Sequence, residues 1–167
     1  MIGNDVIDIT ATRTESNWRR RGFVDKLFSG EEQVLITHSA NPEVTVWLLW
    51  SMKEAAYKIY NRETGIRGFF PLRLKCRMTA YEGEITGEVC CNGRLYFTRT
   101  AIYSDSIHTI AVTDLTDFDK VTEGIKDNII KDAAGVPYIG CSPASVSHHG
   151  RFSKVAYICP TATPAAT

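Results

Sequence analysis

The stretch from Val44 to Tyr60 constrains the fold more than any other part of the sequence, because its pattern is that of a long amphipathic helix. Trp47, Trp50, Ala55 and Ile59 can together form much of a buried face on that helix. A helix with an apolar face of this size must pack against another element of the fold. The remaining segments therefore have to supply its partner.

Local signals indicate where helices begin and end. Asn41-Pro42 is typical of a turn, and the proline can occupy the first turn of the long helix. Gly65 ends the helical region. Ser29 can cap an earlier helix, because Glu32 follows three residues later in the spacing of a capping box. We therefore predict one helix from Ser29 onward and a longer helix that begins near Pro42.

Most of the other regular structure is predicted to be strand. Strands are predicted over residues 1–9, 69–78, 84–91, 94–103, 107–113 and 153–159. The third and fourth of these form a predicted hairpin that turns at Asn92-Gly93. Residues 121–134 have the pattern of a further helix, which Gly135 would end. Residues 137–143 are predicted to be irregular.

Length, charge and cysteine content exclude several classes of protein. The chain has 167 residues, enough for one domain with a sizeable core. Lysine plus arginine equals aspartate plus glutamate at 19 each, which argues against general nucleic-acid binding. The five cysteines include no C-x-x-C pair, so neither a zinc site nor a disulfide framework is indicated. No apolar run approaches the ~18 residues of a membrane span, and we expect a cytoplasmic protein.

The first group of residues that suggests chemistry is Gly3-Asn4-Asp5-Val6-Ile7-Asp8. Two carboxylates interrupt an otherwise apolar strand, and burying such a charge is costly unless it is paired or binds a metal. Side chains alternate along a strand, so Asp5 and Asp8 should point to opposite faces. Asp5 is therefore the better candidate for a metal ligand. Asp8 either joins it, if the strand bends, or caps the next segment.

The second group lies on the long helix, in Trp50-Ser51-Met52-Lys53-Glu54-Ala55-Ala56-Tyr57-Lys58. Glu54 and Lys58 are four residues apart and share one helix face. Such a pair is commonly an exposed salt bridge. Its position among tryptophans and alanines favours a half-buried site instead. A carboxylate that holds a hard cation and a lysine that neutralises phosphate oxygens would together suit a metal–diphosphate complex.

The third group is Ser145-Val146-Ser147-His148-His149-Gly150-Arg151, preceded by Gly135-Val136-Pro137. Serine, histidine, glycine and arginine in a tight loop before a strand would make a phosphate-binding site. Adjacent histidines also suggest a metal, but no further ligand has familiar spacing. A serine nucleophile is a third interpretation, although the G-x-S-x-G motif is absent.

Together these groups resemble the 4′-phosphopantetheinyl transferase superfamily. The family pattern combines a G-x-D strand, an F-S-x-x-E stretch, a W-S-x-K-E-A-x-x-K helix, and a G-x-P segment followed by S-x-S-H. The chain shows Gly3-Asn4-Asp5, Phe28-Ser29-Gly30-Glu31-Glu32, the helix motif of residues 50–58, and Ser145-Val146-Ser147-His148. The helix motif is quite specific, whereas G-x-D alone is weak. The resemblance implies an α+β fold in which an antiparallel sheet packs against the long helix.

The resemblance also implies an activity: Mg²⁺-dependent transfer of the 4′-phosphopantetheine group of coenzyme A to a serine of an apo acyl or peptidyl carrier protein. Asp5 and Glu54 would bind Mg²⁺ on the diphosphate of coenzyme A, and Lys58 would contact a phosphate. Ser147 and His148 would hold the nucleotide near its 3′-phosphate, with Arg151 and His149 as weaker candidates for the same pocket. The carrier serine would attack the β-phosphate and release adenosine 3′,5′-bisphosphate.

The chain departs from the family pattern in three ways. Large, surfactin-synthetase-type members often carry Glu two residues after the metal Asp, where this chain has Ile7, whereas the small, holo-acyl-carrier-protein-synthase type has an acid where Asp8 stands. Val136 occupies a position that often holds Lys or Arg. The S-x-S-H segment comes last, about 40 residues after Ser104-Asp105-Ser106-Ile107-His108, a poorer match in the place that the small type uses.

The motif order predicts the domain organisation. Residues 1–118 would form a core that carries the metal site, residues 119–160 a partial second half, and residues 161–167 a disordered tail. The strand over residues 153–159 should then lie beside the first strand. His148 should face Asp5 and Glu54 across a cleft, within one chain or across a subunit contact. Small family members are trimers and large ones are monomers, so both states stay open.

Three other functions compete with this hypothesis. A homologue of the same fold would bind coenzyme A or a carrier protein without catalysis, but Asp5, Glu54 and Lys58 are all present. A hydrolase that used Ser147 and His148 would leave Glu54 and Lys58 without a role. An unrelated structural domain would explain none of the motifs. The sequence does not identify the type of carrier: fatty-acid, polyketide or peptide.

Overall fold

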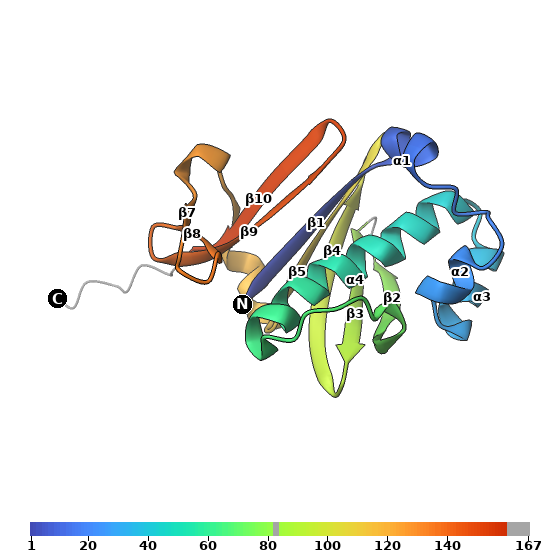
Figure 1. Cartoon of the computed structure of the whole chain (residues 1–167), viewed down its shortest axis with the longest axis horizontal. Helices are drawn as coiled ribbons and strands as arrows, with labels where there is room; N and C mark the ends of the chain where they lie inside the picture. The colour runs from blue at the N-terminus through green and yellow to red at the C-terminus, as the bar shows by residue number, and fades with distance from the viewer. Residues whose placement is uncertain (82–83, 160–167) are drawn as a thin grey trace.

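The computed structural model describes residues 1–81 and 84–159, and the predicted tail of residues 161–167 lies outside the described residues. A first antiparallel sheet has the strand order β1-β5-β4-β3-β2. Its strands are β1 (Ile2–Asp8), β2 (Leu74–Tyr81), β3 (Glu84–Cys91), β4 (Arg94–Ile102) and β5 (Ser106–Val112). Helix α4 (Pro42–Thr64) packs on one face of this sheet, as predicted (Figure 1). The fold is therefore the expected α+β arrangement.

A second antiparallel sheet comes from the last third of the chain and has the order β6-β10-β9-β8-β7. Its strands are β6 (Val121–Glu123), β7 (Ile130–Lys131), β8 (Pro137–Ile139), β9 (Ser142–His149) and β10 (Phe152–Ile158). The long hairpin β9–β10 lies beside β1, on the side away from β5 (Figure 1). The expectation that the first and last strands lie side by side is met.

Short helices complete the chain: α1 (Ile9–Glu15), α2 (Phe23–Leu27) and α3 (Gly30–His38) before α4, and the 3₁₀ helices η1 (Pro71–Arg73), η2 (Leu115–Lys120) and η3 (Lys126–Asn128) after it. The local predictions hold where a short-range signal sets the backbone. Ser29 and Glu32 form the capping box of α3. Pro42 lies in the first turn of α4, and Gly65 caps its end with φ of 69°. Asn92 and Gly93 both have positive φ, as a two-residue hairpin turn requires.

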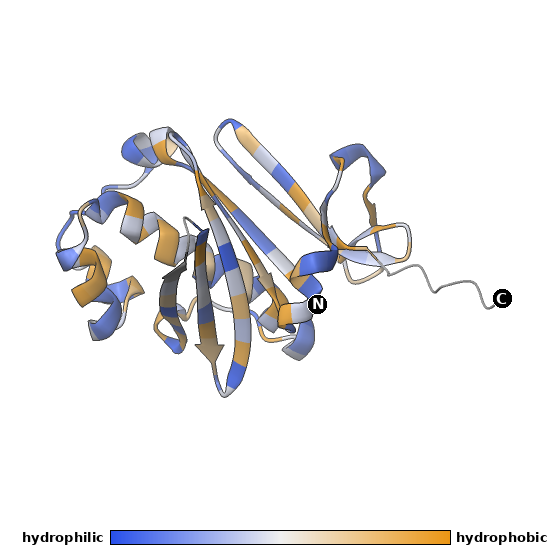
Figure 2. Cartoon of the chain, turned by 180° about the vertical axis from the view of Figure 1, so that it is seen from behind, coloured by the Kyte–Doolittle hydropathy of each residue, from blue (hydrophilic) through white to orange (hydrophobic). Residues whose placement is uncertain are grey.

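The main hydrophobic core fills the space between α4 and the first sheet. Met52, Ala55, Ala56 and Ile59 of α4 are fully buried there, and the strands carry alternating hydrophobic and hydrophilic residues (Figure 2). β1 approaches the helix very closely at Gly3. A Cβ added there would lie 2.0 Å from the carbonyl oxygen of Ala55, so only glycine allows this contact.

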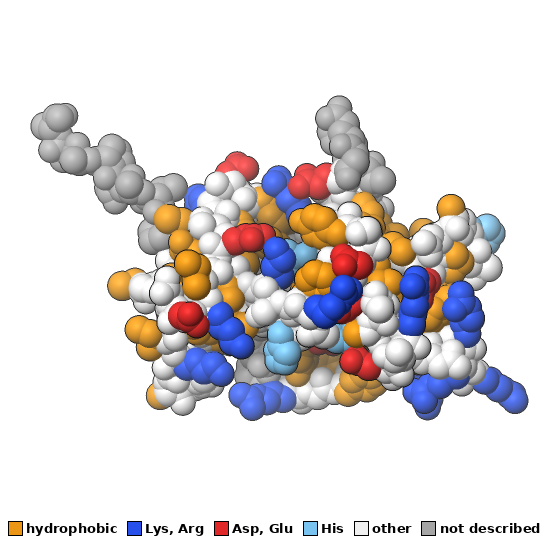
Figure 3. Space-filling view, turned by 90° about the horizontal axis from the view of Figure 1, so that it is seen from above, with side chains coloured by type: hydrophobic (Ala, Val, Ile, Leu, Met, Phe, Trp, Pro, Cys, Tyr) orange, Lys and Arg blue, Asp and Glu red, His pale blue; other side chains and the backbone are white. Residues whose placement is uncertain are grey.

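A smaller apolar cluster joins the two sheets. Ile2 of β1, Val112 of β5, Phe118 of η2 and Ala156 of β10 are all buried in it. Charged side chains of both signs are interspersed over the surface above β1 and the hairpin, in keeping with the balanced composition (Figure 3). The second sheet is thus packed directly on the core strand that carries Asp5.

Two motif residues have a structural role. The ammonium group of Lys53 lies 2.8 Å from the Glu32 carboxylate and donates to the carbonyl oxygens of Pro71 and Leu74, and it is almost completely buried. The other Glu32 oxygen accepts the N–H of Cys76 at 2.7 Å. The F-S-x-x-E stretch and the lysine before Glu54 therefore tie α3, α4 and β2 together.

The predicted helix over residues 121–134 is wrong. This segment forms β6, η3 and β7 instead. Its apolar residues have helical spacing, but Ile125 and Ile130 are 66% and 69% exposed, so no helical face is buried. Val121 pairs with Ile158 of β10, and sheet pairing overrides the local pattern. Two boundaries also shift: β2 begins only after η1, and residues 137–143, predicted to be irregular, include β8 and the start of β9.

Candidate active site

β1 and α4 bring Asp5, Glu54 and Lys58 together. Asp5 lies in the middle of β1, and its backbone carbonyl accepts a hydrogen bond from Ser51 of α4. Glu54 and Lys58 lie on the same face of the helix, and each interacts electrostatically with Asp5. The three charged residues that the motifs singled out therefore form one cluster.

The two oxygens of the Asp5 carboxylate have different surroundings. Oδ1 accepts a hydrogen bond from the Ser147 hydroxyl at 3.0 Å and lies 3.8 Å from the Lys58 ammonium. Oδ2 is buried and has no hydrogen-bond partner among the described residues. Burial raises the pKa of Asp5, and Lys58 and Ser147 act in the opposite direction. A buried carboxylate oxygen without a partner is costly, and a cation would satisfy it.

The pKa of Glu54, the second carboxyl group of the cluster, is also raised. Burial, and after it the negative charge of Asp5, raises the pKa of Glu54 to about 7, while Lys58 opposes the change. Two carboxylates that repel one another in a partly buried site favour a bound cation between them. A perturbed carboxyl group in a cavity is also typical of a functional site.

Lys58 connects the helix to both neighbouring strands. Its ammonium donates to the carbonyl oxygen of Asn4 in β1 and, at 3.2 Å, to that of Val146 in β9. Burial lowers the pKa of Lys58, and the charges of Asp5 and Glu54 oppose this. The lysine thus places a positive charge where β1, β9 and the helix meet.

A cavity of about 250 Å³, which we call the carboxylate pocket, contains both acids. Its lining includes Asp5, Glu54, Trp47, Trp50 and His148. The end of α1 contributes Thr12, Glu15 and Ser16, and β9 contributes His149 as well. The structure therefore brings His148 to the same cavity as Asp5 and Glu54, in one chain.

Ser147 and His148 point in opposite directions, because they are neighbours in a strand rather than in the predicted loop. Ser145, Ser147 and His149 face β1 and accept the backbone N–H groups of Asn4, Val6 and Asp8 at 2.8, 3.1 and 3.0 Å. His148 is exposed and lines the cavities. The two residues thus cannot act as one nucleotide clamp or as a serine–histidine pair.

Asp8 and Arg151 pair with each other. The Asp8 carboxylate caps α1 through the N–H groups of Thr10 and Ala11 and accepts two hydrogen bonds from the Arg151 side chain, at 2.9 and 3.1 Å. Arg151 holds the pKa of Asp8 well below its usual range. Asp8 and Asp5 lie on opposite faces of β1, as the alternation predicted. Asp8 already has cationic and backbone partners, so we assign it no metal and Arg151 no phosphate.

His149 belongs to the same structural contact. Its Nδ1 accepts the Asp8 N–H, and its Nε2 lies 2.8 Å from the Glu15 carboxylate. Together with the Arg151 ion pairs to Asp8 and Asp105, this fixes the tip of the β9–β10 hairpin to α1 and to the β4–β5 turn. The hairpin covers the carboxylate pocket from a defined position.

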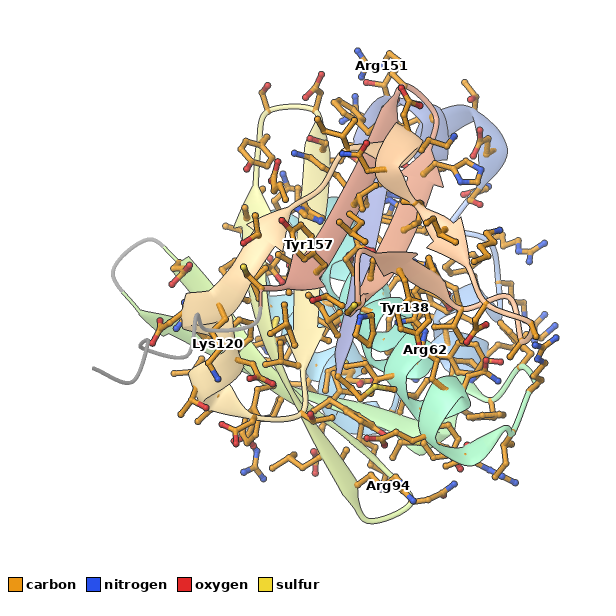
Figure 4. All side chains as sticks on the ribbon, turned by 90° about the vertical axis from the view of Figure 1, so that its left-hand side faces the viewer. Arg62, Arg94, Lys120, Tyr138, Arg151 and Tyr157 are labelled. Atoms are coloured by element: carbon orange, nitrogen blue, oxygen red, sulfur yellow. The ribbon has the colours of Figure 1, made fainter. Side chains whose placement is uncertain are left out.

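A larger cavity of about 840 Å³, which we call the basic cleft, adjoins the carboxylate pocket at His148. Its cationic lining residues are Lys58, Arg62, Arg67, Lys126 and Lys131, and no aspartate or glutamate lines it within the described ranges. Gly135, Val136 and Pro137 form part of its wall. In Figure 4, Arg62 of α4 lies near Tyr138 of β8, whereas Arg151 lies at the opposite end of the hairpin.

Sequence reasoning missed four cations of this cleft: Arg62, Arg67, Lys126 and Lys131. Arg62 carried a usable signal, since it follows Lys58 by one helical turn on the same face. Lys126 and Lys131 carried none, because the segment around them was predicted to be a helix. Val136, by contrast, does line the cleft at the position where the family often has a cation.

The alternative histidine, His108, lies elsewhere. It is buried in β5, where its Nε2 is 3.4 Å from the side-chain amide of Asn4. Burial lowers the pKa of His108 to about 4. His108 lines neither the carboxylate pocket nor the basic cleft, whereas His148 lines both. The position of His148 is therefore the one that suits a ligand.

Comparisons with known proteins agree with the observed fold. The solved structure of holo-[acyl-carrier-protein] synthase from Neisseria meningitidis is similar in fold, with a TM-score of 0.55 and 16% sequence identity. The match covers 68% of this chain and 96% of that one. A search of curated proteins finds no match. No helix among the described residues is long and apolar enough to cross a membrane.

The family model of the 4′-phosphopantetheinyl transferase superfamily matches residues 1–112. This range ends with β5 and includes β1 and α4, which carry Asp5, Glu54 and Lys58. The second sheet, with His148, lies beyond the matched range. On the sequence of its first 112 residues, the chain belongs to the 4′-phosphopantetheinyl transferase superfamily.

Proposed function

We propose that the protein transfers the 4′-phosphopantetheine group of coenzyme A to a serine of an apo acyl or peptidyl carrier protein, with Mg²⁺. The observation that carries this proposal is the junction of the two cavities. A pocket lined by the carboxylates of Asp5, Glu15 and Glu54 opens beside a cleft with five cationic side chains. His148 lines both cavities, and Lys58 of the cleft lies 3.8 Å from the Asp5 carboxylate. A diphosphate linked to a nucleotide has the matching charge distribution.

The chain's residues fit a divalent cation at Asp5 and Glu54. The buried Oδ2 of Asp5 lacks a partner, and Glu54 titrates near neutrality, so both can gain from a metal. No group of three or more His, Cys, Asp or Glu side chains with metal-binding geometry occurs among the described residues. Mg²⁺ suits such a site, because it is usually held by one or two carboxylates together with substrate phosphates and water. The bound ion would neutralise the diphosphate charge during transfer.

The basic cleft is the proposed site of the nucleotide and its phosphates. Lys58 would contact the diphosphate, since its ammonium already lies 3.8 Å from the Asp5 carboxylate. Arg62, Lys126 and Lys131 would neutralise further phosphate charge. His148 at the mouth of the cleft is the proposed contact for the 3′-phosphate.

The carrier serine would enter by the carboxylate pocket, between the end of α1 and Trp47. Its oxygen would bond to the β-phosphorus as the bond to adenosine 3′,5′-bisphosphate breaks. Such phosphoryl transfer depends mainly on positioning and charge neutralisation. Because one chain supplies Asp5, Glu54, Lys58 and His148, the proposed site needs no second subunit.

The direct test is an intact-mass assay of apo acyl and peptidyl carrier proteins with coenzyme A and Mg²⁺. We expect a gain of one phosphopantetheine on at least one carrier, and this also identifies the carrier type. Asp5→Asn should abolish transfer. Asp8→Asn, which retains an oxygen that can cap α1, should keep the same Mg²⁺ concentration dependence. Transfer by the Asp5→Asn variant at the parent rate would contradict the proposed metal site.

The role of His148 has a separate test. His148→Ala should weaken the binding of coenzyme A more than that of 3′-dephospho-coenzyme A, because only the former has the phosphate to lose. His149→Ala is the matched control, since His149 faces β1 and holds the hairpin. Equal loss for both ligands in the His148→Ala protein would rule out the 3′-phosphate contact.

A further inference from the structure

A third cavity, of about 430 Å³, which we call the outer groove, lies on the face of the first sheet away from α4. Val89 of β3 and Tyr96 of β4 are buried in the core beneath α4. Because side chains alternate along a strand, their neighbours Glu88 and Phe97 point to the opposite face, and both line the groove. Figure 2 views the molecule from this side, with α4 behind the sheet. No residue of the described chain lines both this groove and the carboxylate pocket or the basic cleft.

One side of the outer groove is apolar. Leu115 and Phe118 of η2 line it, together with Phe97 of β4. Phe118 is buried in the small apolar cluster between the two sheets, and Phe97 packs against that cluster. Leu115 is 57% exposed. The core therefore holds this side in place, and the groove keeps an open apolar surface, as small-molecule sites commonly do.

The outer groove also contains two arginines without an anionic partner. Arg77 of β2 and Arg99 of β4 line it. Arg99 is half-buried, and the central carbon of its guanidinium group lies 4.4 Å from the centre of the Phe118 ring. Within residues 1–81 and 84–159, neither guanidinium group takes part in a hydrogen bond or a salt bridge. A partly buried charge without a counter-ion is costly, and the planar guanidinium group matches the geometry of a carboxylate.

Glu88 restricts the charge of a ligand in this groove. It lies directly opposite Arg77 in the pairing of β2 with β3, and the two described side chains form no salt bridge. The described lining therefore holds two positive charges and one negative charge. A ligand with a single negative charge would neutralise the groove, whereas a phosphate dianion would add an excess of negative charge beside Glu88. The charges thus favour a monoanion, and the apolar side favours one with a hydrocarbon chain.

We propose that the outer groove binds an aliphatic monocarboxylate, with its carboxylate between Arg77 and Arg99 and its chain against Leu115 and Phe118. β3 runs between the strands of the two arginines, so the carboxylate would lie above β3. The cavity volume is within the range of ~300–1,000 Å³ that is common for small-molecule sites. This inference goes beyond the proposed function, because the ligand would bind on the face of the sheet that is away from α4 and the charge cluster.

The test uses octanoate as the probe in isothermal titration calorimetry. Octanamide, which has the same chain length without the charge, and acetate, which has the charge without the chain, should each bind at least about tenfold more weakly. Arg99→Gln should lower the octanoate affinity about tenfold or more, the loss expected for a hydrogen bond to a charged group. Glu88→Gln should raise it about two- to fivefold, because it removes a like charge at a solvent-accessible site. Arg94→Gln is the matched control, since Arg94 lies on the same strand, pairs with Glu63 and does not line the groove.

The outcomes locate the ligand as well as detect it. Arg62→Gln should keep the parent octanoate affinity, and a loss in this variant would place octanoate in the basic cleft and overturn the inference. Equal losses in Arg99→Gln and Arg94→Gln, or no binding of octanoate to the folded parent protein, would also overturn it. So would self-association in sedimentation that Arg99→Gln abolishes, because a second copy of the chain would then cover the groove. The Glu88→Gln variant guards against misfolding as the cause, since misfolding does not raise affinity.

Discussion

Replacing Glu54 with glutamine tests whether the ionised Glu54 carboxylate lowers the free energy of unfolding of the protein. Burial and the charge of Asp5 raise its pKa from an ordinary 4.5 to about 7. As the pH rises through this interval, the unfolded chain releases the proton first, so the free energy of unfolding falls until about pH 7. At ~1.36 kcal/mol for each pH unit, the interval corresponds to ~3 kcal/mol.

Glutamine has nearly the same shape but cannot ionise. We therefore expect Glu54→Gln to match the parent protein near pH 4.5 and to exceed its free energy of unfolding by up to ~3 kcal/mol at pH 8. Urea unfolding of both proteins over this pH range, in the presence of a chelator, measures the difference. The variant should be more stable than the parent and yet inactive in the intact-mass assay.

A surface glutamate provides the control for this experiment. Glu31 is exposed in the first turn of α3, where its charge favours the helix, so Glu31→Gln should lower stability by ~0.5 kcal/mol at pH 8. A difference between Glu54→Gln and the parent that stays constant from pH 4.5 to 8 would refute the reasoning. So would a loss of stability at pH 8.

Three further predictions concern the residues that hold the site in place. Gly3→Ala should destabilise the fold by ~1–3 kcal/mol in urea unfolding, because its Cβ would meet the backbone of α4; a neutral effect would contradict the close contact. Lys53→Met should cost ~3–5 kcal/mol, because it leaves the Glu32 charge buried and unpaired; rescue by Glu32→Leu in the double variant checks the cause. Ser147→Ala should weaken Mn²⁺ binding measured by electron paramagnetic resonance, because the hydroxyl orients Asp5; unchanged Mn²⁺ affinity would show that this hydrogen bond is dispensable.

The parts of the fold that could be predicted are those that short-range chemistry determines. The Ser29–Glu32 capping box, the proline at the start of α4 and the Asn92-Gly93 turn each depend on residues within one turn of backbone. The structure of residues 121–135 is not determined by such short-range contacts. Its aliphatic residues are compatible with a helix, and only pairing with β10, which comes later in the chain, selects the strand. No pattern within fifteen residues contains that information.

The candidate site divides in the same way. Asp5, Glu54 and Lys58 were predicted as a cluster, and the structure brings them together. The joint assignment of Ser147 and His148 to the nucleotide assumed that both lie in a loop. In the strand observed, their side chains separate, so the hydroxyl holds Asp5 and the imidazole lines the cavities. Whether Ser147 and His148 can contact the same ligand depends on whether β9 includes them. The ends of strands are the features that sequence patterns predict least well.

The contact between β9 and β1 explains how the charged side chain of Lys58 can lie between these two strands. β1 is the edge strand of the first sheet, and every second backbone N–H along such an edge points outward, where another strand can accept it. Here Ser145, Ser147 and His149 accept those N–H groups through their side chains, so β9 lies next to β1 without backbone pairing.

The greater separation that results leaves room for an ammonium group. Lys58 donates to the carbonyl oxygens of Asn4 and Val146, which ordinary pairing would have satisfied with backbone N–H groups. Direct pairing of the two strands would exclude this lysine and bury the Asp5 carboxylate without its nearest positive charge. The side-chain contacts between the sheets are therefore a structural condition for the charge cluster, and they show how the second sheet contributes to the site at β1.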